Sequence, residues 1–364
     1  MRFKSLELKN FRNYAELSLE FDPGLNLITG MNGRGKTNII EGLYVMGMGR
    51  SFRTSKDREM IMFGCDEARA SSVVVSDEGR ETEISINYSG EGKLIKVDGI
   101  KLNRTIDLLE NVYIVVFSPD DLRIIKDGPE NRRRFLDREL CQLKPVYYSD
   151  LGNYKNVLRQ RNAVIRQGGG DEHLLEVFDE SLARYGVRIA DERKQFIERI
   201  KGICASIHSD ISSSAEELNI FYETDSVFEG SFEEKTEQFR RQLEAGREKD
   251  LFRGFTGFGP HKDDIGIEIN GTDARLYGSQ GQQRTAALSL KLAEIELIRS
   301  ETGCRAVLLL DDVLSELDEN RQRYLIESMK DVQTFVTATE IDERLKSLLP
   351  KGKSFVCEGG KVLT

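Results

Sequence analysis

The sequence lacks the cysteine pattern of a zinc site. Its 364 residues include only five cysteines, and no two of them form a C-x-x-C pair. An odd number of scattered thiols suits a reducing compartment better than a disulfide framework. No apolar run approaches the length of a membrane span, and residues 1–30 show no secretory signal. These absences predict a cytosolic protein without a structural zinc site.

The sequence also lacks an excess of basic charge. It has 53 Lys and Arg against 62 Asp and Glu, a net charge of −9. A general polycation is therefore excluded, and any contact with nucleic acid must use a local basic patch. The hydrophobic share of 39% is that of an ordinary soluble protein, and the length allows one large core or two domains.

A phosphate loop is the most informative feature that is present. The segment Gly30–Thr37 (GMNGRGKT) matches G-x-x-x-x-G-K-[ST], with an apolar strand before it and helical apolar spacing at 38–46. The glycines let backbone N–H groups turn toward a triphosphate, Lys36 reaches its β/γ-phosphates, and the Thr37 hydroxyl is placed to bind Mg²⁺. The alternative is a chance glycine-rich turn, which the complete motif and both flanks disfavour. The predicted nucleotide contacts here are Gly30, Asn32, Gly33, Gly35, Lys36, Thr37 and Asn38.

The first 120 residues have the pattern of strands around this loop. Alternating or continuous apolar runs predict strands at 3–10, 17–21, 72–75, 83–88, 94–97 and 113–117. Asp98-Gly99 is a typical hairpin turn. Residues 47–53 are too rich in glycine for a predicted helix.

From residue 118 to about 254 the pattern is mostly helical and strongly charged. Helices are predicted from Pro145 to a stop at 168–170, at 171–212 with an interruption possible near Gly202, and at 232–249, with a short strand at 219–223. There are no sustained heptads, so a long coiled coil is excluded. We interpret 121–254 as a helical arm domain inserted into a discontinuous α/β head, 1–120 and 255–364.

The chain then returns to strands, predicted at 265–269 and 274–277 around an Asn270-Gly271 turn, at 306–312, and at 334–337 as the last clear core strand. The third of these ends in two acids. In a parallel sheet its carboxyl end would deliver Asp311 beside the phosphate loop, to hold Mg²⁺ opposite Thr37. Asp312 would orient or deprotonate the attacking water. The alternative is two solvated acids that cap the next helix.

Ser279 begins a predicted helix in the segment Gly278–Gln282 (GSQGQ). Its hydroxyl and the first helical N–H groups offer a second phosphate site, and one use for it is the γ-phosphate bound to another subunit. The alternative is a plain helix N-cap. The spacing to the strand that ends in Asp311 favours the first hypothesis.

Together these motifs resemble the ATP-binding-cassette heads of chromosome-maintenance ATPases and, more narrowly, the bacterial RecF family. The resemblance rests also on the segments 8–14, 49–53, 128–137, 259–264 and 278–285, which are spread over nearly the whole chain. The family is similar to the heads of the zinc-hook repair ATPases but lacks their long coiled coil and apical C-x-x-C.

The resemblance implies an ATP-binding-cassette head of mixed sheets with a helical arm, and a weak, DNA-dependent ATPase that uses ATP and Mg²⁺. It also implies an ATP-dependent homodimer that binds DNA at single-strand gaps, acts with RecR and RecO, promotes RecA loading, and is released by slow hydrolysis. By position, Ser279 with Gly281 would contact the partner's nucleotide, and Asp318 would be a cross-interface residue. Lys36, Ser279 and Asp312 are the implied catalytic residues.

Two departures from transporter-type cassettes stand out. No histidine follows the last predicted strand, where Thr337-Ala338-Thr339-Glu340 stands, so the usual γ-phosphate switch is missing or replaced by a threonine. Position 312 carries Asp instead of the longer Glu. The second departure suggests slow turnover.

Candidate DNA contacts come from basic clusters. Residues 121–170 hold 11 Lys and Arg and 6 Asp and Glu, a net charge of +5. The candidates for phosphate contacts are Arg132, Arg133, Arg134, Arg159, Arg161 and Arg166, and one arginine of 132–134 is expected to be structural. The alternative is an ordinary salt-bridged helical surface. Arg50 and Arg53 form a second patch or contact the nucleotide. No base-reading motif is present, so recognition of DNA shape is predicted.

Three other classes share part of this pattern. A transporter ATPase subunit has a smaller insertion and normally a switch histidine. A fragment of a chromosome-condensing ATPase needs long heptad helices. A GTPase of the phosphate-loop class carries N-K-x-D, which this sequence lacks.

Overall fold

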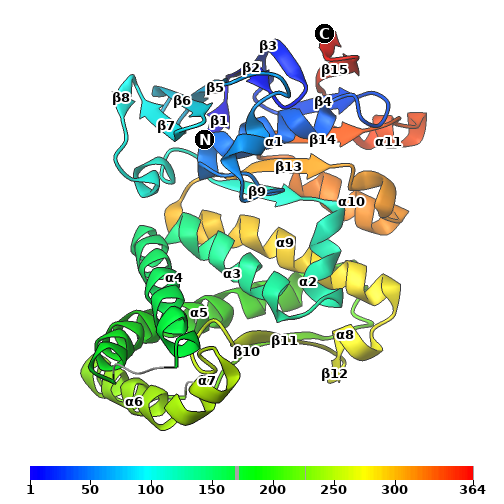
Figure 1. Cartoon of the computed structure of the whole chain (residues 1–364). Coiled ribbons are helices and arrows are strands. Elements are labelled where there is room, and N and C mark those ends of the chain that lie inside the picture. The colour runs from blue at the N-terminus through cyan, green and yellow to red at the C-terminus, as the bar shows by residue number, and fades with distance from the viewer. Residues whose placement is uncertain (169–171, 226, 364) are drawn as a thin grey trace. The chain divides into compact units, whose positions relative to one another are not determined.

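The computed structural model describes residues 1–168, 172–225 and 227–363. Internal contacts divide the chain into two compact units. We call 1–122, 207–215 and 284–364 the head unit, and 123–206 with 216–283 the arm unit (Figure 1). Residues 255–283 were assigned to the head domain from the sequence, and their contacts group them with the arm. The domain limits themselves stay a prediction.

The nucleotide-binding half of the head unit is a mostly parallel sheet. Its order is β16 (Lys361–Leu363), β15 (Gly352–Glu358), β4 (Leu25–Thr29), β14 (Thr334–Ala338), β13 (Val307–Asp311) and β9 (Ile114–Phe117), with only β16 antiparallel. Every residue of β9, β13 and β14 is buried, as the continuous apolar runs predicted. Parallel strands end at one edge, so residues that follow β4, β13 and β14 come together there.

The other half of the head unit is an antiparallel sheet. It is built from β1 (Arg2–Phe3), β2 (Ser5–Phe11), β3 (Tyr14–Glu20), β5 (Ala68–Val75), β6 (Glu81–Ser89), β7 (Gly92–Val97) and β8 (Ile100–Lys101). The Asp98-Gly99 turn joins β7 and β8 with both residues at positive φ, 49° and 77°. This geometry matches the predicted hairpin turn.

Helix α1 (Lys36–Met48) follows the phosphate loop and contacts strands of both sheets (Figure 1). All residues from 39 to 48 are buried, as expected of a helix that is apolar on every side. The prediction that residues 47 and 48 are not helical is wrong. A Cβ at Gly47 would lie 2.6 Å from Cδ1 of Ile114, so the glycine lets the last turn of α1 approach β9 closely.

The remaining elements of the head unit are η1 (Asp57–Met60), η2 (Thr105–Leu108), η3 (Pro119–Leu122), η4 (Leu314–Glu316), α9 (Gln280–Thr302, whose first turn belongs to the arm unit), α10 (Glu319–Ser328) and α11 (Glu343–Leu348). The predicted last clear core strand, 334–337, is followed in the sheet by β15, which pairs with every residue of β4 and has only two of its own 7 residues buried.

The arm unit contains α2 (Arg123–Lys126), α3 (Pro129–Leu143), α4 (Pro145–Arg166), α5 (Glu172–Ile211, which continues into the head unit), β10 (Leu218–Glu223), α6 (Phe232–Ala245), α7 (Arg247–Arg253), β11 (Asp264–Ile269), β12 (Thr272–Asp273) and α8 (Ala274–Tyr277). Strands β10, β11 and β12 form a small antiparallel sheet.

Three local predictions for this unit need correction. Helix α5 runs through Gly202 without interruption, and the helix predicted at 232–249 is divided at Gly246 into α6 and α7. The strand predicted at 274–277 is helix α8, because the Asp273 carboxylate accepts hydrogen bonds from the N–H groups of Arg275 and Leu276 and caps a helical turn. The predicted stop at 168–170 lies mostly outside the described residues. Across the described ranges, no helix combines the length and the apolar character needed to span a membrane.

Candidate nucleotide site

The phosphate loop has a backbone that only glycine fits at two positions. Gly30 and Gly35 have φ values of 144° and 106°. A Cβ on Gly30 would lie 2.5 Å from the carbonyl oxygen of Cys357 on β15, and one on Gly35 would lie 2.5 Å from the Tyr14 hydroxyl on β3. Strands from both sheets therefore confine the loop, and larger side chains are excluded.

The N-terminus of α1 is prepared for an anion. Gly35 is its N-cap residue, and no side chain among the described residues accepts a hydrogen bond there. Lys36 is buried, and its Nζ donates to the carbonyl oxygen of Gly30, 2.7 Å away, inside the loop. Uncapped N–H groups, the helix dipole and a lysine ammonium converge on one place, as a phosphate site requires.

Asp311 lies beside this loop, as predicted. Its Oδ1 accepts hydrogen bonds from the hydroxyls of Thr37 and Thr337, each 2.9 Å long. Burial raises the pKa of Asp311, the two hydroxyls oppose that shift, and the neighbouring Asp312 adds to it. A cation bound nearby would stabilise the ionised form of a buried carboxylate that lies next to a second acid.

The donor set at Asp311 fits Mg²⁺. A carboxylate and a threonine hydroxyl are hard oxygen ligands, which Mg²⁺ prefers. No group of three or more His, Cys, Asp or Glu side chains that could hold a metal occurs in the described part of the chain. A Mg²⁺ held by Thr37 and Asp311 would therefore take further ligands from phosphate oxygens and water.

Asp312 leaves the strand in an unusual conformation. Its φ is 55°, and its N–H donates to the Thr337 hydroxyl, 2.9 Å away. Non-glycine residues in this region cost free energy and cluster at functional sites. Thr337 thus bridges both acids, a role that sequence reasoning missed. The reason is that Thr337 pairs with Asp311 only through the β13–β14 register. Two residues further on, the Thr339 hydroxyl donates to Oδ1 of Asn32 in the phosphate loop, 3.2 Å away.

Glu41 on α1 is a second residue that the sequence did not single out. Its side chain is fully buried and binds Arg12 through two hydrogen bonds of 2.8 and 2.6 Å. Arg53 also binds it, at 3.1 Å, and donates from the same Nη1 to Oδ1 of Asn38, 2.9 Å away. Arg53 is therefore anchored to the phosphate-loop helix, which favours a nucleotide contact over a separate DNA patch. The role of Arg50 stays a prediction.

Ser279 and Asp318 cap helices locally. The Ser279 hydroxyl accepts from the N–H of Gln282 (3.2 Å), whose side chain accepts from the N–H of Ser279 (2.8 Å), a reciprocal capping pair. Asp318 caps α10 by accepting from the N–H of Arg321, and its carboxylate pairs with that side chain. Ser279 is exposed, and Gly281 lies in the first turn of α9. Their contacts across a dimer stay predictions.

The prediction that Arg132 contacts DNA is wrong. Its side chain is only 6% exposed, and Nε and Nη2 each donate to the Asp264 carboxylate at 2.7 Å. Its Nη1 donates to the carbonyl oxygens of Ile124 and Asp127. Arg132 is thus the structural arginine that was expected among 132–134.

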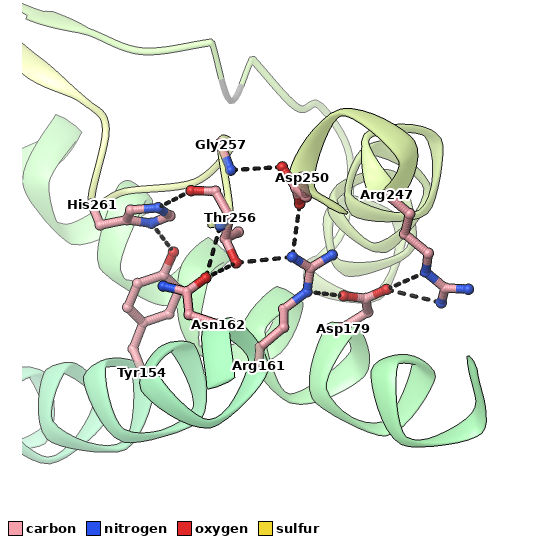
Figure 2. Close-up of polar contacts among 9 residues, drawn as sticks. All are labelled: Tyr154, Arg161, Asn162, Asp179, Arg247, Asp250, Thr256, Gly257 and His261. Carbon is pink, nitrogen blue, oxygen red and sulfur yellow. Dashed lines mark hydrogen bonds and ion pairs between the residues drawn. The ribbon is translucent and has the colours of Figure 1, made fainter. Parts of the chain in front are cut away.

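The prediction that Arg161 contacts DNA is wrong for a similar reason. Arg161 is fully buried, and it donates to Asp179 at 2.6 Å, to Asp250 at 2.7 Å and to the Thr256 hydroxyl at 2.8 Å (Figure 2). Arg159, two residues earlier on α4, is exposed and donates to Oδ1 of Asn156. Two residues along a helix turn the side chain by about 200°, so the two arginines face opposite ways. Arg159 remains a candidate.

Comparisons with known proteins find relatives of this chain. Residues 2–346 match the RecF/RecN/SMC N terminal domain. The chain is 42% identical over 346 residues to the DNA replication and repair protein RecF of Clostridioides difficile, covering 94% of this chain and 93% of the relative. It is 44% identical to that of Lachnoclostridium phytofermentans, covering 94% of each.

Solved structures agree as well. A recombination mediator protein RecF-ATPrS of the RecFOR pathway matches with a TM-score of 0.92 and 39% identity over 99% of this chain and 97% of that one. An Smc head bound to the C-winged helix domain of ScpA matches with a TM-score of 0.57 at 17% identity, which shows a shared fold.

Proposed function

Because this chain belongs to the RecF family of ATPases, we propose that it is an ATP-dependent DNA repair protein that dimerises on ATP. The dimer binds DNA at single-strand gaps, without sequence preference, and acts with RecR and RecO to load RecA in the cytoplasm. Slow, DNA-dependent hydrolysis of ATP then releases the dimer. In support, the relatives are DNA replication and repair proteins, and two similar solved structures are of RecF in the RecFOR pathway.

The observation that carries this proposal is the 2.9 Å hydrogen bond from Thr37 to Asp311. It joins the phosphate loop to the acid-ended strand, although 274 residues separate the two in sequence. Lys36 and the N–H groups of α1 bind the phosphates, and Asp312 orients or deprotonates the attacking water. When bound, Mg²⁺ supplies a Lewis acid at the phosphate oxygens.

Dimerisation is tested at Ser279. Ser279→Arg places a bulky cation where the partner's γ-phosphate is proposed to lie, so the ATP-dependent dimer should be lost. ATP binding should remain, since the phosphate loop is untouched. Sedimentation with ATP, ADP or no nucleotide measures the first effect, and anisotropy of a fluorescent ATP analogue measures the second. Ser89→Arg, at an exposed position on β6 of the head unit, serves as the control. A Ser279→Arg chain that still dimerises with ATP would disprove the trans contact.

Hydrolysis is tested at Asp312. Asp312→Asn removes the proposed base and keeps Thr37 and Asp311 as metal ligands. We expect ATP affinity within about threefold of the original, and a fall in hydrolysis of at least about 100-fold, the usual scale of general-base catalysis. The ATP-bound dimer should therefore persist, which size-exclusion chromatography measures over time. Equal loss of ATP binding would mean that Asp312 holds the nucleotide instead.

DNA binding is tested through its salt dependence. Each phosphate contact on duplex DNA changes the slope of log affinity against log salt by about −0.9. A dimer presents two copies of one basic surface, so ATP should tighten binding and steepen that slope. Arg159→Glu should weaken binding in both states without affecting the dimer. Anisotropy of gapped DNA across salt concentrations decides this. A slope that ATP leaves unchanged would contradict binding by the dimer.

A further inference from the structure

The arm unit contains a cavity that the nucleotide site does not use. Its volume is about 210 Å³, and it is open to solvent between α3, α4, α5 and the segment before β11. A water takes up about 30 Å³ of liquid, so a group as large as phosphate fits. The charged or titratable side chains of its lining include Arg133, Arg134, Asp137, Lys155, Arg193 and His261.

Two segments that carry the family resemblance meet at this cavity. Residues 128–137 contribute Arg133, Arg134 and Asp137, and residues 259–264 contribute Pro260 and His261. Neither segment contains a residue of the phosphate loop or of the acid-ended strand. Arg132 and Asp264 join the two segments structurally, but the proposed ATPase chemistry uses neither segment.

An ion pair between Arg193 and Asp137 forms the floor of the cavity. Asp137 accepts hydrogen bonds from Arg193 at 2.7 Å, from Lys155 at 3.0 Å and from the Tyr147 hydroxyl at 2.7 Å. Burial opposes ionisation of Asp137, but the two cations and the hydroxyl lower its pKa below the usual range. Because Arg193 is itself buried and also donates to the carbonyl oxygen of Pro260, this floor is rigid. The only other acid of the lining, Glu130, forms an exposed pair with Arg134.

Arg133 is a cation of the lining that forms no ion pair with Asp137. It is half-buried, and its Nη1 donates to the backbone carbonyl oxygen of Asp263, 2.7 Å away. It forms no ion pair with any residue that the structure describes. Burial lowers its pKa and repulsion from Arg193 lowers it further, while the charges of Asp264, Glu130 and Asp137 oppose the shift only in part. A half-buried guanidinium beside a second cation is costly unless an anion joins it.

The pKa of His261 also reflects the positive charges near the cavity. Its Nε2 lies 2.9 Å from the carbonyl oxygen of Thr256, so that nitrogen carries the proton, and Nδ1 accepts from the Tyr154 hydroxyl (Figure 2). Burial, and then the charges of Lys262 and Arg133, lower the pKa of His261 to about 4. The ring is therefore neutral at pH 7, and the charge of the cavity comes from its arginines and Lys155.

We propose that this cavity is a second anion site, which binds a phosphate group between Arg133, Arg134 and Lys155. The guanidinium groups offer paired donors that match phosphate oxygens, and the exposed Lys155 and Arg134 can turn toward the anion from the rim. Asp137 holds Lys155, and the Asp263 carbonyl oxygen and Glu130 hold Arg133 and Arg134. The phosphate belongs either to a small molecule, such as a free nucleotide, or to DNA, whose terminal and backbone phosphates offer the same chemistry.

The test uses the full chain with Lys36→Ala, so that binding at the phosphate loop is strongly weakened. Calorimetric titration with inorganic pyrophosphate probes the small-molecule source. Anisotropy of two duplexes of one sequence, one with a 5′-phosphate and one with a 5′-hydroxyl, probes the DNA source. Adding Arg133→Gln should weaken binding in at least one of the two assays by about tenfold, the scale of a lost charge-assisted hydrogen bond. Arg133→Lys should restore part of it.

Matched controls separate the outcomes. Arg184→Gln removes an exposed arginine of α5 that does not line the cavity, and should change neither assay. Arg133→Gln in the otherwise unaltered chain should bind ATP normally, which checks the fold and the phosphate loop independently. Dependence on Arg133 in the pyrophosphate assay assigns a small phosphate ligand, and dependence in the duplex assay assigns DNA. Binding in neither assay, or binding that Arg133→Gln leaves unchanged, overturns the proposal and leaves the ATPase function standing.

Discussion

Lys36→Met is expected to weaken ATP binding by about 100-fold. Methionine keeps the length and the apolar stem of lysine, so the buried position stays filled. It removes the ammonium that lies inside the phosphate loop, where Nζ is 2.7 Å from the carbonyl oxygen of Gly30. A hydrogen bond to a charged group contributes about 1.5–3 kcal/mol, and each 1.4 kcal/mol is about tenfold in affinity. Anisotropy of a fluorescent ATP analogue measures the change.

The matched control for this result is Lys4→Met. Lys4 is an exposed lysine of the head unit that pairs with Glu81. Removing an exposed ion pair costs little, so ATP affinity and stability should stay as they are. An unchanged ATP affinity in Lys36→Met would show that the triphosphate does not bind in this loop.

Arg161→Met is expected to destabilise the arm unit by about 3–5 kcal/mol, the cost of removing one partner from a buried ion pair. The change leaves Asp250 without its arginine, and Asp179 with only Arg247, which binds it at 2.9 Å (Figure 2). Hydrogen exchange along α4, α5 and α7 measures the loss locally, which avoids the assumption that both units unfold together.

Arg159→Met is the matched control on the same helix. Its arginine is exposed, so stability should change by less than about 0.5 kcal/mol. If α4 contacts DNA, Arg159→Met should lower DNA affinity. Arg161→Met should lower it only as far as the arm unit loses its fold. If Arg161→Met kept its exchange protection and lost DNA binding, Arg161 would be a contact after all.

The phosphate loop and the acid-ended strand were predictable because their chemistry is local. Gly30, Lys36 and Thr37 must be adjacent for one anion to meet all of them, so a short pattern specifies the site. The approach of Asp311 to Thr37 followed from a general rule, that parallel strands carry their ligand-binding residues at one edge. No partner strand had to be known for either prediction.

Thr337 and Cys357 could not be predicted in this way. Thr337 contacts Asp311 on the neighbouring strand, and the Cys357 carbonyl confines Gly30 of the phosphate loop. Both contacts depend on the order of the strands in the sheet, which neither segment specifies by itself. The strand predicted at 274–277 is a helix because the Asp273 carboxylate caps its first turn, a local contact that the apolar pattern does not show.

By itself, the sequence predicted a nucleotide site, the residues that would surround its phosphates, and the family to which the chain belongs. Only the tertiary structure decided which charges are available. Arg132, Arg159 and Arg161 look alike in the sequence, since each is a basic residue in a basic stretch. Burial beside Asp264, Asp179 and Asp250 makes two of them structural. Charge is a property of the residue, whereas desolvation and pairing depend on what the fold packs against it.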